Sequence, residues 1–195
     1  MAVIRLLLLA VLLVAGCSPG PVASPSPAAS PAASPAAPSL ADETGPAMST
    51  STPTRVSIPA LGVSVPLVGL GLRGDGSMEV PGDAETVGWY TKAPTPGALG
   101  PAVLAGHVDF KKRPGTFAHL ADLRAGDRIV VDRADGSTAT FGVTEVGRYP
   151  KDEFPTDAVY GPIDVAGLRL ITCGGDFDRA AGHYEDNVVA FATLR

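Results

Sequence analysis

Cysteine and histidine are scarce in this chain, which has two cysteines and three histidines among 195 residues. The two cysteines do not form a C-x-x-C pair, and no histidine stands near a cysteine at the spacing of a zinc site. The sequence also lacks the basic run typical of nucleic-acid-binding proteins, and its formal net charge is −5. These absences argue against a zinc protein and against a partner made of nucleic acid.

The first seventeen residues, MAVIRLLLLAVLLVAGC, have the organisation of a secretory signal, with Arg5 before an apolar run. The run is too short to be interpreted first as a membrane-spanning helix. Its end, LVAGC at 13–17, resembles the cleavage site of a bacterial lipoprotein signal. We therefore expect lipidation of Cys17, which would hold the protein at the extracytoplasmic face of the cell membrane. The alternative is an uncleaved anchor helix in which the cysteine stands by chance.

Residues 18–53 consist largely of proline, alanine and serine and show no hydrophobic periodicity. Such a segment cannot bury a core, so it is predicted to be a disordered, rather extended tether. The remaining segment, 54–195, has the length of one ordinary domain.

Within 54–195, short β-rich runs alternate with Gly, Pro and Asp turns, and the pattern predicts a mainly β domain, either a barrel or a sandwich. Ala134-Asp135-Gly136 joins two alternating runs into a hairpin. The apolar runs LRLITC and NVVAFATL are expected in the centre of the sheet. One segment, GTFAHLADL at 115–123, has helical spacing. Further strands are expected at 55–68, 77–82, 86–91 and 101–108.

Cys173 ends the apolar run LRLITC and is followed by two glycines. If Cys17 carries a lipid, Cys173 has no disulfide partner, and a lone cysteine in an exported protein is a candidate reactive thiol. A free thiol ionises near pH 8.5, so a nucleophilic cysteine needs a neighbouring base or positive charge, and donors for an oxyanion. The alternative is a buried cysteine that only fills space in a strand.

The three histidines differ in their surroundings. His107 ends the apolar run PAVLAGHV, and Gly106 before it permits close approach of backbone or ligand. His119 lies in the helical segment and is expected at or near the surface. His183 lies in a polar loop and is expected to be solvated.

A histidine at one strand end, then a later apolar strand that ends in Thr-Cys, then an arginine in the next loop, resembles the sortases, which are cysteine transpeptidases of bacterial cell surfaces. The similar segments are RVSIPALGVSVPLVGLGL at 55–72, PAVLAGHVD at 101–109 and LRLITCGG at 168–175. The segments TCGGDFD and GHYEDNVVAFA are most similar to class F. The resemblance implies a closed β-barrel of about eight strands with one or two short helices.

The resemblance also implies roles for individual residues. Cys173 would attack the threonine–glycine carbonyl of a Leu-Pro-any-Thr-Gly sorting signal, and His107 would be the acid and base. An amine of the cell wall or of a pilin-like protein would then accept the acyl group. Thr172 would help to shape the oxyanion region, or would only face outward from its strand.

The arginine of the family is harder to assign. Its expected slot on the strand after the cysteine holds Asn187, so we assign the role to Arg179, in the loop just after Cys173. The alternatives are that Asn187 supplies the donor in a substrate-binding role, that Arg169 turns inward, or that Arg179 is a surface charge paired with a nearby carboxylate.

No cofactor or metal is expected, because the carboxylates Asp109, Asp176 and Asp178 do not make a recognisable calcium site. The sequence bears on two other hypotheses. An L,D-transpeptidase would have a second histidine close upstream of the cysteine, which is missing here. A non-catalytic surface lipoprotein that binds a ligand in a β-barrel fits the anchor and the tether equally well.

Overall fold

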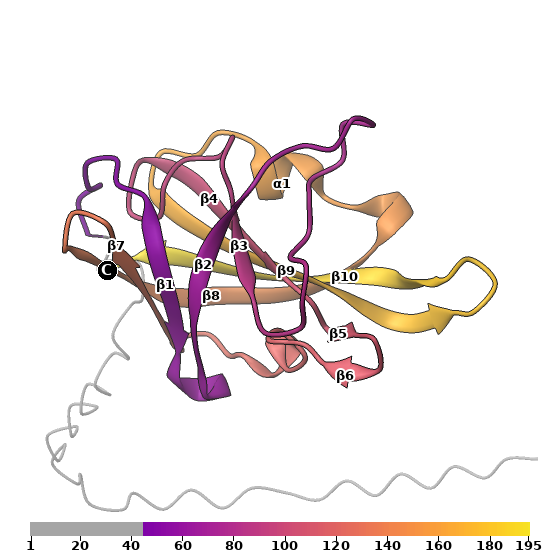
Figure 1. Ribbon diagram of the computed structural model, residues 1–195. Helices are drawn as coiled ribbons and strands as arrows, with labels where there is room; N and C mark the ends of the chain where they lie inside the picture. Colours follow the sequence, from indigo (N-terminus) through magenta and orange to yellow (C-terminus); the bar gives the residue numbers. More distant parts are fainter. Residues whose placement is uncertain (1–44) are drawn as a thin grey trace, which may run out of the picture. The chain divides into compact units, whose positions relative to one another are not determined.

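The computed structural model describes residues 45–195, which form a mainly β structure (Figure 1). The predicted signal segment 1–17, with its lipidation at Cys17, and the tether as far as residue 44 lie outside the described residues. The barrel strands are β1 Pro53–Ile58, β2 Val63–Leu70, β3 Val87–Tyr90, β4 Gly100–Gly106, β7 Arg128–Arg133, β8 Thr138–Pro150, β9 Ala166–Asp178 and β10 His183–Leu194.

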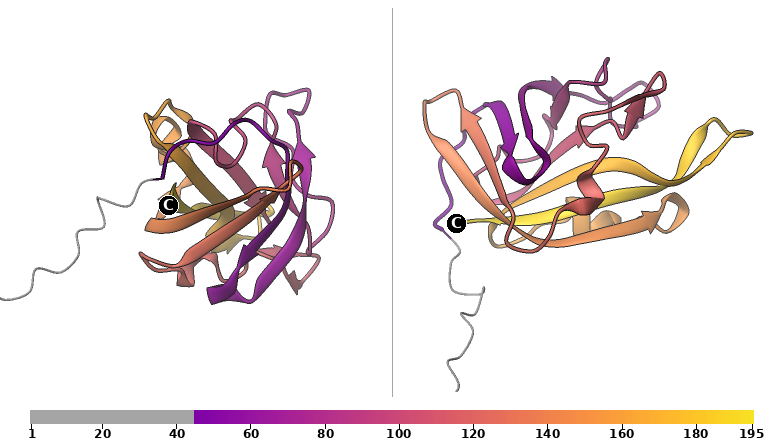
Figure 2. Two further views of the ribbon diagram at one scale, coloured as in Figure 1. Left: turned by 90° about the vertical axis from the view of Figure 1, so that its left-hand side faces the viewer. Right: turned by 90° about the horizontal axis from the view of Figure 1, so that it is seen from below.

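These strands close in the order β1-β2-β3-β4-β9-β10-β8-β7, with β7 pairing back to β1. The closed ring is visible end-on in Figure 2. Two pairs, β2–β3 and β4–β9, are parallel, and the other pairs are antiparallel. The predicted barrel of about eight strands is confirmed, and β9 lies between β4 and β10, where its apolar sequence favours burial on both faces.

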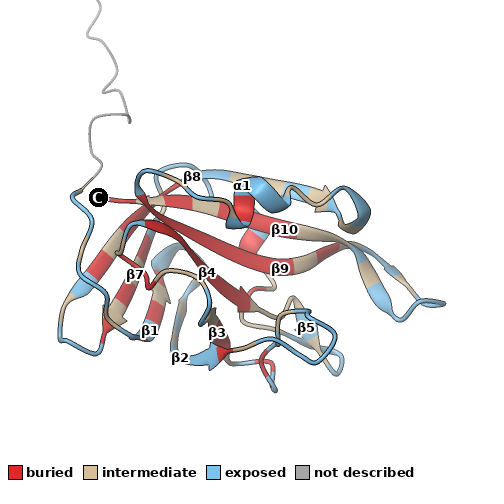
Figure 3. Cartoon of the chain, turned by 90° about the horizontal axis from the view of Figure 1, so that it is seen from above, coloured by how far each residue is buried: buried red, intermediate tan, exposed pale blue. Residues whose placement is uncertain are grey.

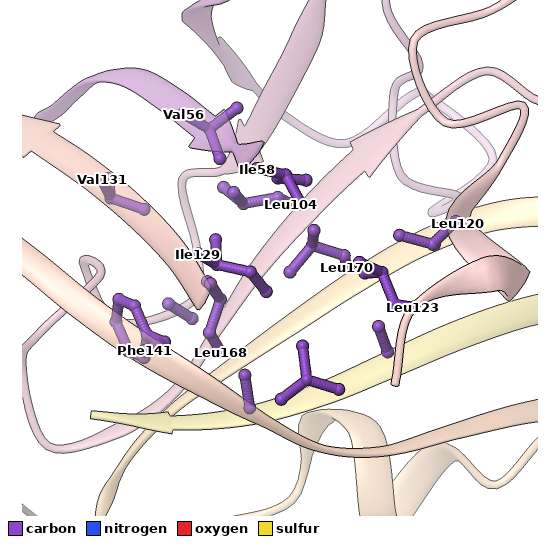
Figure 4. Packing of buried hydrophobic residues seen from close by; sticks show 14 of the residues in the cluster. Val56, Ile58, Leu104, Leu120, Leu123, Ile129, Val131, Phe141, Leu168 and Leu170 are labelled. Carbon is purple, nitrogen blue, oxygen red and sulfur yellow. The ribbon is translucent and has the colours of Figure 1, made fainter. Parts of the chain in front are cut away.

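The core fills the barrel interior with aliphatic side chains from almost every strand. Figure 4 shows Leu104, Leu168 and Leu170 directed toward the same interior as side chains of β1 and β7. A second, smaller cluster lies on the outer side of β4, β9 and β10 and contains Val103, Val159, Ile171 and Val189. In Figure 3 the buried stretches of β4 and β9 give way to exposed residues at the tip of the β9–β10 hairpin.

Residues 45–52 precede β1 and contact the barrel. The Gly45 N–H donates to the Leu194 carbonyl at 3.0 Å, and the Met48 N–H donates to the Gly97 carbonyl at 2.8 Å. Met48 also packs against the core. The last residues of the predicted tether therefore lie along the domain, because their backbone groups find partners that the composition does not reveal.

Two local expectations are met only in part. The segment 115–123 forms turns and one 3-10 turn, Leu120–Asp122, and the chain is extended again at Leu123. Phe117 and Leu120 are buried as expected, but the segment is too short to propagate an α-helix. The expected strand at 77–82 is reduced to one bridge between Leu72 and Met78.

A five-residue helix, α1 Thr156–Tyr160, was not predicted. It follows Pro155 and packs Val159 on the outer cluster. Two short strands, β5 Asp109–Phe110 and β6 Arg113–Pro114, form a separate hairpin after β4. Within residues 45–195, no helix is long and apolar enough to cross a membrane.

Candidate active site

The parallel pairing of β4 with β9 brings His107 and Cys173 to the same height. Ala105 is the partner of Ile171 in this ladder. His107 lies two residues after Ala105, just past the end of β4, and Cys173 lies two residues after Ile171 in β9, so both are on the same face. Because neighbouring strands are about 4.8 Å apart, the two side chains begin next to each other.

The antiparallel pairing with β10 extends this row. Asn187 is the direct partner of Cys173, and Tyr149 of β8 is the partner of Asn187 on the other side. His107, Cys173, Asn187 and Tyr149 therefore form a row across four neighbouring segments. The sequence predicts that His107, Cys173 and Asn187 share one site. The strand pairing places these three residues side by side.

The alternation of β9 decides which way the side chains point. Leu168 and Leu170 belong to the interior core, whereas Ile171 belongs to the outer cluster beneath α1. Cys173, two residues after Ile171, therefore faces outward on the sheet and is half-buried. Within the described residues it is a free cysteine.

A cavity of about 430 Å³ opens over this row. Its floor is β4 and β9, and its walls are the β2–β3 connection on one side and the segment from the end of β8 through α1 on the other. It is lined by Met78, Val80, Pro81, Ala105, Gly106, His107, Lys151, Phe154, Thr156, Tyr160, Ile171, Thr172, Cys173 and Asn187.

His107 is held from three sides. Its Nε2 lies 2.8 Å from the carbonyl oxygen of buried Pro81. Because a carbonyl oxygen only accepts, Nε2 carries a proton, and Nδ1 is the nitrogen left to exchange one. The His107 carbonyl accepts the Phe117 N–H at 3.0 Å, and the imidazole lies 5.0 Å from the ring of Phe110. These contacts fix the ring orientation and its tautomer.

Gly115 packs directly against the backbone of His107. A Cβ at Gly115 would collide with the His107 carbonyl and lie 2.8 Å from the His107 Cβ. We therefore expect Gly115→Ala to displace His107 and to lower the free energy of unfolding by about 1–3 kcal/mol. Thermal unfolding and an activity assay on the same preparation measure both effects. Gly126→Ala, whose positive φ adds strain but whose Cβ meets nothing within 4 Å, is the control that leaves the site in place.

The two glycines after Cys173 do not end the strand as expected, because β9 continues through them to Asp178, with an irregularity in its pairing to β10 at this point. Gly175 has φ of +76°, and a Cβ there would collide with the carboxylate of Asp186. The left-handed backbone and the close approach both require glycine at this position. Thr172, the residue before the cysteine, is 5% exposed, and its hydroxyl has no hydrogen-bond partner among the described residues.

Neither arginine considered from the sequence lines this cavity. Arg179 is exposed in the β9–β10 turn and borders a separate hollow together with Asp109, Lys111, Lys112, Asp176, Phe177 and Tyr184. Arg169 is buried under α1, where it donates to the Ala158 carbonyl at 3.4 Å and stacks 4.8 Å from the Phe191 ring. Burial lowers the pKa of Arg169. The assignment of Arg179 stays a prediction, and the geometry sets it apart from the cavity of Cys173.

Several cavity residues were missed by the sequence reasoning, and two of them, Lys151 and Tyr160, carry polar groups that bear on the chemistry. Lys151 begins a 3-10 turn, Lys151–Glu153, at the end of β8, and its ammonium donates to the Tyr184 carbonyl. A lysine in a Pro-Lys-Asp-Glu turn carries no motif, and only the strand pairing that places the end of β8 beside β10 reveals it. Tyr160 adds a hydroxyl to the same cavity, and burial, reinforced by Tyr90, raises its pKa.

The three carboxylates considered for calcium do not form one cluster. Asp178 accepts hydrogen bonds from the Ala180 and Ala181 N–H groups, which lower its pKa. Asp109 and Asp176 face the hollow that also contains two lysines and Arg179. Across residues 45–195, no group of three or more potential metal ligands is found.

The arrangement to compare with known proteins is a closed β-barrel with a free cysteine within β9 and a histidine just after the end of the neighbouring strand β4. The family model described as the sortase domain matches residues 56–195. The chain therefore belongs to the sortase family, and this membership indicates a cysteine transpeptidase. A comparison with curated protein sequences finds no match.

Solved structures with this fold include sortases of several classes. Sortase C-1 from Actinomyces oris is 23% identical, with a TM-score of 0.55 and coverage of 73% of both chains. A sortase D5 transpeptidase from Clostridium perfringens is 18% identical, with a TM-score of 0.55 and coverage of 74% of this chain and 79% of its own. Sortase A from Corynebacterium diphtheriae is 18% identical, with a TM-score of 0.55, and the match covers 75% of this chain and 62% of that one.

Proposed function

We propose that this protein is an extracytoplasmic cysteine transpeptidase, most similar to class F sortases, that cleaves Leu-Pro-any-Thr-Gly-like sorting signals and transfers them to an amine. The observation that carries the proposal is the row in which Cys173 lies between His107 and Asn187 at the floor of one cavity. Membership of the sortase family supports the same reaction.

The geometry supports a two-stage acyl transfer. Nδ1 of His107 takes the thiol proton of Cys173, the sulfur attacks the threonine carbonyl carbon, and the carbonyl π electrons move to the oxygen. When the tetrahedral species collapses, the C–N bond breaks and Nδ1 of His107 delivers a proton to the departing glycine nitrogen. An incoming amine then loses a proton to Nδ1 and attacks the thioester, which releases Cys173.

The cavity walls fit the apolar part of such a signal. Val80 and Pro81 stand on one wall, Phe154 and Tyr160 on the other, and Ile171 lies on the floor. These side chains can cover a leucine and a proline, whose burial contributes about 25 cal/mol per Å² of apolar surface. Asn187 offers an amide donor next to the sulfur, and the buried hydroxyl of Thr172 offers another polar group below it.

The cellular setting completes the proposal. The apolar N-terminal sequence and Cys17 support a lipid anchor at the extracytoplasmic face of the membrane, with residues 18–44 as a spacer. Surface proteins with sorting signals are the substrates, and an amine of the cell wall or of a pilin-like protein is the acceptor.

A peptide library tests the reaction. The protein is incubated with fluorogenic peptides that vary each position of Leu-Pro-any-Thr-Gly, with and without hydroxylamine as a small acceptor. We expect cleavage after threonine and, with hydroxylamine, a C-terminal hydroxamate that reports the thioacyl intermediate. If no peptide is cleaved and none protects Cys173 from an alkyl methanethiosulfonate, the non-catalytic ligand-binding lipoprotein becomes the better description.

A further inference from the structure

We propose that Lys151 is a catalytic residue of this site, the cation that balances the negative charge on the carbonyl oxygen during acyl transfer. The inference rests on the proposed function and names a residue for a role that the sequence had assigned to an arginine. It follows from which charged groups border the cavity, from where the ammonium is held, and from where the reaction develops charge.

The charge census of the cavity points to Lys151. Among the described residues that line it, Lys151 is the one lysine or arginine, and none of them is an aspartate or a glutamate. No ion pair to Lys151 is present within residues 45–195. The ammonium group therefore borders a largely apolar cavity that has no carboxylate in its lining.

The position of Lys151 follows from the same row of strands. Tyr149 pairs with Asn187, and Asn187 pairs with Cys173, so the end of β8 is two strands away from the sulfur. Lys151 lies two residues beyond Tyr149 and is half-buried. The Tyr184 carbonyl of β10 accepts one ammonium N–H, which holds the group between β8 and β10. Two of its three donors remain for a substrate.

The chemistry needs a positive group on the same cavity as the Cys173 sulfur. As the sulfur–carbon bond forms, one electron pair of the carbonyl becomes a charge on oxygen, and the charge disappears again when the C–N bond breaks. A cation fixed beforehand stabilises that charge more than it stabilises the neutral substrate, so it raises kcat. Asn187 supplies a neutral donor beside Cys173, and Lys151 supplies the charge.

Other cations are less well placed. Arg179 borders a different hollow, and Arg169 is committed to α1 and Phe191. Arg148 borders a smaller hollow with Thr172 and Cys173, but it pairs with Val188, whose side chain belongs to the interior core. The side chain of Arg148 therefore leaves the sheet on the face opposite to Cys173.

The test compares Lys151→Gln with Lys151→Arg in the full-length protein in detergent, using the peptide that the wild-type protein cleaves best. Glutamine keeps an N–H donor for the Tyr184 carbonyl but removes the charge, and arginine keeps both. We expect Lys151→Gln to lower kcat by about 100-fold with little change in KM, and Lys151→Arg to stay within about tenfold of wild type. Lys92→Gln, an exposed lysine after β3, is the matched control with wild-type kinetics.

Two further readouts separate catalysis from structure. Thermal unfolding of Lys151→Gln should match wild type, and iodoacetamide should alkylate Cys173 at the wild-type rate, measured on the peptide that contains it. Wild-type kcat in Lys151→Gln overturns the inference, as does an equal loss in Lys151→Gln and Lys151→Arg accompanied by a lower unfolding midpoint. Slower alkylation in Lys151→Gln also overturns it, because the lysine would then act on the thiol before any oxyanion forms.

The proposed function fails separately. If the wild-type protein and Cys173→Ala are equally inactive on every peptide, the transpeptidase proposal is wrong and the role of Lys151 is lost with it. An active wild-type protein whose Lys151→Gln variant is unimpaired rejects the role of Lys151 alone.

Discussion

Replacing Cys173 by alanine is expected to lower peptide cleavage by about 10⁴-fold or more, because Cys173 is the one thiol among the residues that line the cavity and a thiol is the strongest nucleophile there near neutral pH. The change removes one sulfur atom from a half-buried position, so the free energy of unfolding should change by only about 1 kcal/mol. Cleavage of the best library peptide and thermal unfolding, measured on the same sample, test both parts.

Two comparisons make the Cys173→Ala result specific. Cys17→Ala removes the other cysteine of the chain and should leave the cleavage rate of a soluble peptide unchanged. Hydroxamate formation should disappear with Cys173→Ala and persist with Cys17→Ala. Substantial turnover by Cys173→Ala would show that the thiol is not the nucleophile, and the reaction would have to be assigned to another group.

The barrel was predictable because each strand carries its own signal. Apolar runs and Gly-Pro-Asp turns place β1, β2, β4, β7 and β8 within a few residues, and the hairpin at Ala134-Asp135-Gly136 joins β7 and β8 as expected. The choice between barrel and sandwich depended on the resemblance to sortases. Which strands are neighbours depends on long-range packing. The pairing of β4 with β9 therefore cannot be predicted from the local sequence of either strand.

In the candidate site too, some residues were predictable from local sequence and others depend on long-range packing. His107 and Cys173 each follow an apolar run and have a glycine beside them, so the sequence alone marked them, although β9 continues past Cys173 to Asp178 and only His107 stands at a strand end. The group that would stabilise the oxyanion beside Cys173 and His107 could not be found from sequence spacing. Which side chain lies there depends on the register of β8, β9 and β10. Asn187 is the strand partner of Cys173, and Arg179 lies at another hollow. Lys151, at the end of β8, lines the cavity of Cys173. Short elements such as α1 were missed because five residues held by tertiary contacts carry almost no periodicity.

His107→Gln is expected to lower cleavage of the amide peptide by about 10³-fold. Glutamine can still donate to the Pro81 carbonyl, so the β2–β3 connection keeps its contact, but glutamine cannot exchange a proton at the position of Nδ1. His119→Gln is the matched control: that imidazole is exposed, contacts Asp122 at 3.0 Å and lies outside the cavity, so its loss should not affect turnover.

The role of His107 can be separated from simple disruption by changing the leaving group. In a peptide ester with a phenolate leaving group, the phenolate departs without being protonated. The glycine amine of the natural bond, in contrast, must be protonated as the C–N bond breaks. The defect of His107→Gln should therefore shrink from about 10³-fold on the amide to about tenfold on the ester. An equal defect on both substrates would mean that His107 acts before bond cleavage, and the Nε2–H tautomer fixed by Pro81 would then serve the thiol and not the departing amine.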